Sequence, residues 1–151
     1  MTGARTQLLA NDELFAVFPD HGRYAVDDAH VRLADLAGVP WIFDPADTSP
    51  GQWARNACRE AGFEPDVRYV ASDLLLQIHL AETGHAAAVI PGLLLAAVPR
   101  PAATIMPLPG RPHRRLTTGI RAGAARHPAI RAFREALRQT IRDTSRGEAQ
   151  S

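Results

Sequence analysis

Three short polar stretches carry the side chains best suited to ligand binding. They are residues 44–49, Ser72-Asp73 and Pro91-Gly92, and each follows a run of apolar residues. Each stretch also contains residue types that start helices. Helix starts present free backbone N–H groups, which favour a carboxylate or a phosphate. The chemistry that these stretches indicate is the binding of a small anion.

The candidate binding residues share a place just after the predicted strands: Asp44, Thr48, Ser49, Ser72, Asp73 and Pro91. A structural role competes with each binding role, because Ser49 and Ser72 are N-caps that any helix could have. Asp44 and Asp73 would repel an anion unless they accept hydrogen bonds from its neutral groups. The convergence of the stretches, more than any single residue, indicates a site.

Alternating strands and helices would position these stretches. The predicted strands are residues 13–18, 39–43, 66–71, 86–90, 104–108 and 113–120. The predicted helices are residues 31–37, 49–61, 72–83, 93–98 and the segment after Pro128. Strands and helices in alternation with short connections predict a parallel sheet. The carboxyl ends of parallel strands share one edge, where ligands of open α/β folds bind.

Local signals mark the helix ends. Ser49 is predicted to cap a helix that has Pro50 in its first turn and Gln52 in a capping box. Ser72 is predicted to cap the next helix, and Gly84 to end it. The segment GHAAAVIPG, residues 84–92, is then a buried strand between a helix stop and a helix start.

Composition excludes several classes of protein. The chain has 151 residues, 46% of them hydrophobic and 22% charged, which suits one packed domain. The sequence has no apolar run long enough for a membrane helix and no secretion signal, so a cytoplasmic protein is expected. Cys58 is the single cysteine and is predicted to be a packing residue, not a nucleophile.

Catalytic constellations are absent from the sequence, so an enzyme is not expected. It has no glycine-rich phosphate loop and no histidine pair at metal-ligand spacing, and we predict no cofactor and no metal. The six histidines are scattered and are interpreted as surface or packing residues.

All 17 basic residues are arginines, and they concentrate near the C-terminus. Residues 1–110 have a net charge of −6, whereas residues 111–151 have a net charge of +7. The terminal helix has an apolar stripe beside an arginine stripe; the apolar stripe is Ile130, Phe133, Leu137 and Ile141. A docking helix with a solvated edge is favoured over a DNA-reading helix, because only one aromatic residue lies among the arginines.

Three motifs, in order and spacing, resemble the effector-binding domain of LysR-type transcriptional regulators. They are LADLAGVPWI at residues 33–42, CREAGFEP at residues 58–65 and ETGHAAAVIP at residues 82–91. The resemblance extends over residues 9–145. The family's third motif usually has a second glycine where Ala86 or Ala87 stands in this sequence.

The resemblance implies a type 2 periplasmic-binding-protein-like fold of two α/β lobes with a small effector between them. Residues 36–110 would form a complete second lobe, while residues 9–35 and 111–147 would supply elements of an incomplete first lobe. It places the effector at the same three polar stretches. The apolar stripe of the terminal helix would then need other cover or remain an exposed patch.

The resemblance also implies the partners. A small effector, possibly a carboxylate, and a homo-oligomer are expected, and no membrane. DNA would be bound only through an N-terminal winged helix-turn-helix domain that these residues lack. An alternative function is a truncated interaction module that associates with itself or with full-length regulators without sensing a ligand.

Overall fold

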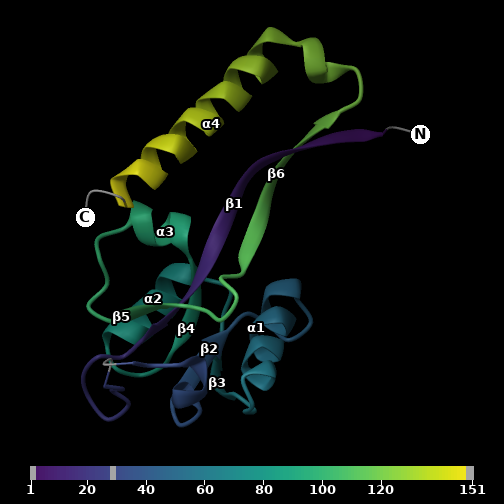
Figure 1. The fold of residues 1–151 in the computed structure, drawn as a ribbon. Coiled ribbons are helices and arrows are strands. Elements are labelled where there is room, and N and C mark those ends of the chain that lie inside the picture. The colour runs from purple at the N-terminus through teal and green to yellow at the C-terminus, as the bar shows by residue number, and fades with distance from the viewer. Residues whose placement is uncertain (1–2, 28–29, 149–151) are drawn as a thin grey trace. The chain divides into compact units, whose positions relative to one another are not determined.

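The chain forms two compact units. The computed structural model describes residues 3–27 and 30–148. The first unit comprises residues 1–13, 91–99 and 113–151, and the second comprises residues 14–90 and 100–112. Strand β1 (Ala4–Phe18), drawn in purple in Figure 1, contributes residues to both units.

The second unit is built on two small sheets. In one, β2 (Pro40–Phe43) and β3 (Asp66–Val70) pair in parallel. In the other, β1 lies between β4 (Ala88–Pro91) and β5 (Thr104–Pro107), with β5 antiparallel to β1. One parallel bridge, Trp41 to Ala87, joins β2 to the segment that leads into β4. The predicted strands are confirmed, but they form a mixed, divided sheet and not one parallel sheet.

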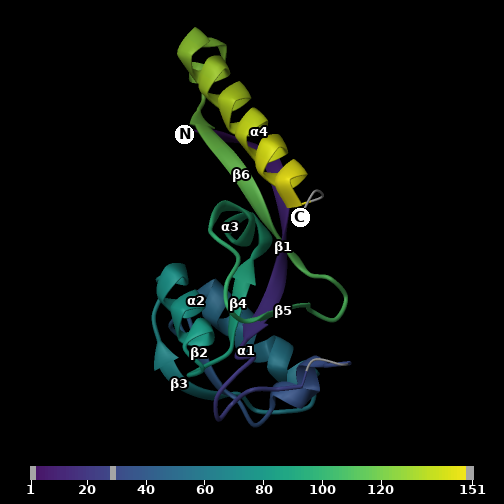
Figure 2. The same cartoon turned by 90° about the vertical axis from the view of Figure 1, so that its left-hand side faces the viewer.

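Two helices pack against β2, which is buried at all four positions. They are α1 (Ser49–Glu60) and α2 (Leu74–Glu82), which both lie beside the parallel strands in Figures 1 and 2. The Trp41 and Phe43 rings are 5.1 Å apart between centroids. A continuous apolar strand of this kind is expected where both faces of a sheet are covered. The strand ends at Phe43, the last residue of this buried apolar run, because the polar Asp44 follows it.

The first unit is an antiparallel ribbon with helices. Residues 4–13 of β1 pair with β6 (His113–Arg121), with an irregularity between Leu8 and Ala10. The long helix α4 (Pro128–Glu148) runs alongside this ribbon in both views (Figures 1 and 2). The short helix α3 (Gly92–Ala97) packs against α4, and one 3-10 turn, η2 (Ala124–Arg126), leads into α4.

Three sequence-based boundaries are wrong. The strand predicted at residues 13–18 starts at Ala4, because β6 pairs with an exposed segment that has no hydrophobic alternation. The helix predicted at residues 31–37 is one 3-10 turn, η1 (Leu33–Leu36). The sequence also predicts that residues 146–151 fray. Helix α4 instead continues to Glu148, and residues 149–151 lie outside the described residues.

In the described part of the chain, no helix is long and apolar enough to cross a membrane.

Cys58 is a buried core residue on α1, as its sequence context predicts. Burial raises the pKa of its thiol to about 12 from a usual 9.0, with the charge of Glu64 adding to the effect. The folded protein is therefore expected to react with iodoacetamide at pH 8 about a thousandfold more slowly than after unfolding in urea. Between pH 9.0 and about 12 only the unfolded state releases this proton, so the thiol's contribution to stability is lost as the pH rises. Equal alkylation rates in the folded and unfolded protein would contradict this assignment.

Candidate functional site

The first two polar stretches meet at the ends of the parallel strands. β2 ends at Phe43 and β3 ends at Val70, and these two residues are register partners. The Ala71 backbone N–H donates a hydrogen bond of 3.1 Å to the Phe43 carbonyl. Asp44, which follows Phe43, and Ser72, which follows Ala71, therefore leave the sheet at the same edge. The prediction that these two stretches meet at one sheet edge is confirmed, and ligand binding there stays a prediction.

A buried amide joins the same two stretches. The Gln77 side chain on α2 is 1% exposed. Its Nε2 donates to the Ala71 carbonyl at 2.8 Å and to Asp44 Oδ2 at 3.3 Å. The Gln77 amide thus links Asp44, at the start of the loop after β2, to Ala71, just before Ser72. Because a buried amide is costly without partners, this link restrains both loops.

The start of α1 differs from the predicted one. Thr48, not Ser49, is the N-cap, and its Oγ1 accepts from the Gly51 backbone N–H at 3.2 Å while donating to the Pro45 carbonyl at 2.7 Å. Ser49 is the first helical residue and is exposed. A threonine with β-region backbone and Pro50 within the first turn outweigh the Ser49 capping box.

The start of α2 also differs by one residue. Asp73, not Ser72, is the N-cap. Its Oδ1 accepts from the Leu75 N–H at 2.9 Å and from the Leu76 N–H at 3.2 Å. A carboxylate satisfies the helix terminus better than a hydroxyl because its charge also complements the helix dipole. Ser72 is left exposed.

Close packing holds the first loop over the start of α1. A Cβ atom at Gly51 would lie 2.1 Å from the Pro45 carbonyl oxygen and 2.6 Å from the Asp44 carbonyl oxygen. Arg55 Nη1 donates to the same Asp44 carbonyl at 3.0 Å and to the Gly51 carbonyl at 2.8 Å. This guanidinium also lies over the Phe43 ring, 5.6 Å from its centroid. A positive charge therefore stands beside a loop that is otherwise acidic.

A limited set of polar groups remains for a ligand. Among the described residues, the backbone N–H groups of Ser49 and Leu74 and the Ser49 and Ser72 hydroxyls make no intramolecular hydrogen bond. Asp44 uses Oδ2 to accept from Gln77 and Asp73 uses Oδ1 to cap α2, which leaves Asp44 Oδ1 and Asp73 Oδ2 as acceptors. The site offers four donors and two acceptors. Such a set suits a small anion that also carries neutral donor groups.

Pro91, the remaining predicted site residue, belongs to the first unit. It ends β4, is buried, and stands at the N-cap position of α3. Its role in ligand binding stays a prediction.

Gln77 and Gly51 were missed by the sequence analysis. Gln77 had a usable signal, because it is the one amide in the apolar helical segment LLLQIHLAE, where a buried polar group needs partners nearby. Gly51 was overlooked because a glycine in the first turn of a helix often has no structural cause. Its cause here is the close approach of the loop backbone at Asp44 and Pro45 to the first turn of α1.

Solved structures share this fold. The chain matches the C-terminal domain of a probable LysR family transcriptional regulator from Rhodococcus sp. RHA1 with a TM-score of 0.66 and 23% identity, covering 89% of this chain and 67% of that one. It matches the CcmR regulatory domain of Synechocystis PCC6803, solved in complex with 2-PG, with a TM-score of 0.71 and 15% identity over 93% of this chain and 68% of that one. It also matches CbnR, a LysR family transcriptional regulator, with a TM-score of 0.65 and 22% identity over 92% of this chain and 48% of that one.

The fold is therefore the α/β fold of a regulator's effector-binding domain. The sequence model of the LysR substrate binding domain matches residues 1–142, and the chain belongs to this family. No curated protein matches the sequence. The chain spans about two thirds of the solved regulatory domains and about half of the longer regulators.

Proposed function

We propose that this chain is the ligand-sensing part of a LysR-type transcriptional regulator and that it binds a small anionic effector at the edge of the β2–β3 sheet. The observation that supports the proposal is the junction at Gln77, which holds the Asp44 and Ser72 loops together. Two helices start at this junction, and each keeps one free backbone N–H group. The proposed contacts within the second unit are the predicted residues Asp44, Ser49, Ser72 and Asp73.

The charges restrict the kind of effector. The second unit contains 11 acidic residues and 7 arginines, so a simple anion is repelled at long range. A ligand that places a carboxylate on the Ser49 and Leu74 N–H groups and donates hydroxyl groups to Asp44 or Asp73 avoids this repulsion. We infer that the effector is a hydroxy- or amino-substituted carboxylate. Thr48 acts by holding the α1 terminus, because both of its hydrogen-bonding roles are already used.

DNA binding is not part of what we propose for these residues. CbnR has been solved at full length with its target DNA, and this chain covers 46% of that protein with a TM-score of 0.62. No catalytic role is proposed, because the site brings together hydrogen-bonding groups without a nucleophile and base pair.

Calorimetry with a panel of small hydroxy- and amino-carboxylates tests the proposal. Ser72→Ala is expected to weaken the tightest ligand by about fivefold to tenfold, the value of one typical hydrogen bond. Ser145→Ala, an exposed serine on α4, is the matched control and should change the affinity by less than about twofold. An equal effect of the two substitutions, or no binding across the panel, would exclude the proposed site.

A further inference from the structure

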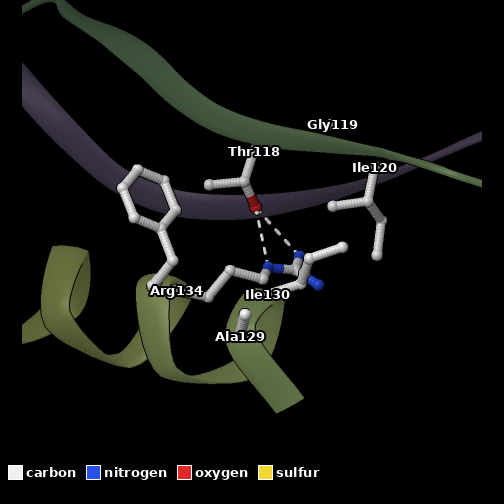
Figure 3. A pocket seen from close by; sticks show the side chains of 7 residues that line it. Thr118, Gly119, Ile120, Ala129, Ile130 and Arg134 are labelled. Carbon is white, nitrogen blue, oxygen red and sulfur yellow. Dashed lines mark hydrogen bonds between the residues drawn. The ribbon is translucent and has the colours of Figure 1, made fainter. Parts of the chain in front are cut away.

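The first unit contains a cleft between β6 and α4. Its volume is about 410 Å³, within the roughly 300–1,000 Å³ range of small-molecule sites. One wall comes from β6 and the other from the first turns of α4 (Figure 3). The lining residues are Thr118, Gly119, Ile120, Ala129, Ile130, Phe133 and Arg134.

Most of the cleft wall is apolar and still accessible. Phe133 is 65% exposed, which is high for a phenylalanine, and it lines the cleft. Ile120 and Ile130 are half-buried on the facing walls. The apolar stripe predicted for the terminal helix therefore does remain partly uncovered at Phe133. Apolar surface grouped in this way marks a place where a ligand or a partner binds.

The polar end of the cleft is a guanidinium without an anion. Arg134 Nε and Nη2 donate to Thr118 Oγ1 at 3.1 Å and 2.9 Å, so two donors share one neutral oxygen (Figure 3). In residues 3–27 and 30–148, Arg134 makes no ion pair, whereas Arg138 and Arg142 on the same helix both pair with Glu135. The edge formed by Nε and Nη2 matches the two oxygens of a carboxylate, and a hydroxyl uses this geometry poorly.

The surrounding charges also favour an anion. The first unit contains ten arginines and five acidic residues. Asp12 is paired with Arg114, Glu135 with its two arginines, and Asp143 accepts from Gln139. None of these carboxylates lines the cleft. A negatively charged group that enters would meet attraction from the whole unit and no local repulsion.

We propose that this cleft binds an organic monocarboxylate with a compact aromatic or branched apolar body. The carboxylate pairs with Arg134 and shares the Thr118 hydroxyl, while the body packs on Ile120, Ile130 and Phe133. One guanidinium and one hydroxyl suit a single carboxylate, whereas a phosphate dianion would need more donors. The site lies wholly within the first unit, so it goes beyond the proposed effector site and does not depend on it.

Benzoate is the probe, and amide-resolved NMR of the whole chain is the readout. Benzoate is expected to shift the amides of residues 118–120 and 129–134. Arg134→Gln should weaken binding by about tenfold or more, because a charge-assisted pair is lost. Arg131→Gln removes an exposed arginine of the same helix that does not line the cleft, and should change affinity by less than about twofold. Benzamide, the neutral counterpart of benzoate, should bind about tenfold more weakly.

A second variant separates lost binding from lost folding. Ala129→Leu fills the cleft without touching Arg134 or its bonds to Thr118, and it should abolish the benzoate shifts while the rest of the spectrum is retained. Equal binding of benzoate and benzamide would overturn the proposal, as would unchanged affinity in Arg134→Gln. Benzoate shifts confined to Ser49, Ser72 and Leu74 would also overturn it and would place the ligand at the effector site instead. If benzoate shifts none of the amides that line the cleft, the proposal is also overturned.

Discussion

Replacing Gly51 by alanine is expected to lower the free energy of unfolding by about 3 kcal/mol. In an open helix the same change would stabilise, because alanine is the better helix former by about 1 kcal/mol. Here the new methyl group would lie 2.1 Å and 2.6 Å from two backbone carbonyl oxygens of the preceding loop. Neither oxygen belongs to a flexible side chain, so the loop must move away from the helix. Denaturant unfolding measures the change.

The control is Gly38→Ala, where a Cβ atom would meet nothing within 4 Å. Gly38 is also absent from the positions with positive φ, so alanine should change stability by less than about 0.5 kcal/mol. Displacement of the loop would carry Asp44 and Thr48 with it. Gly51→Ala is therefore also expected to weaken effector binding in the fraction that folds. A neutral or stabilising effect would mean that the loop and α1 are not packed as described.

Replacing Arg114 by glutamine is expected to cost about 3 kcal/mol of stability. The Asp12 side chain is 1% exposed, and it accepts from Arg114 Nε at 2.8 Å and from the Leu93 N–H at 2.9 Å. Without Arg114 a buried carboxylate keeps a single N–H partner. Because the Arg114 side chain is 43% exposed, water softens the loss and places it at the lower end of the range for broken buried pairs.

Replacing the other partner of this ion pair should lower the free energy of unfolding by less. Asp12→Asn keeps an acceptor for Leu93 and frees Arg114 to turn to water, so a loss of about 1 kcal/mol is expected. Arg115→Gln, an exposed arginine next to Arg114, is the control and should be nearly neutral. Urea unfolding of the three variants gives the order. Equal costs for Arg114→Gln and Asp12→Asn would show that burial of the carboxylate does not set the energy of this pair.

Local signals were sufficient to locate most elements. Signals of this kind mark an element from within a few residues of it. They are the apolar run at β2, the glycines after α1 and α2 with φ of +98° and +81°, and the proline-glycine pair at the start of α3. Sequence reading therefore found these elements and the edge at which Asp44 and Ser72 meet. The first half of β1 was missed because its order comes from pairing with β6, more than 100 residues later in the chain.

The details of the site depended on competition between neighbouring residues. Thr48 and Ser49 are both acceptable N-caps, as are Ser72 and Asp73, and one residue of shift decides which hydroxyl is free for a ligand. Sequence preferences cannot resolve such a shift. The same is true of Gln77, whose two acceptors come from loops 6 and 33 residues away.

An NMR titration with the tightest carboxylate of the calorimetric panel tests the central claim most directly. If the chain senses an anionic effector at the β2–β3 edge, the amides of Ser49, Ser72 and Leu74 will shift together and saturate at one affinity. Ser72→Ala will reduce that affinity. If these three amides stay unchanged while the ligand binds, the effector site lies elsewhere and the proposed function of this edge is wrong.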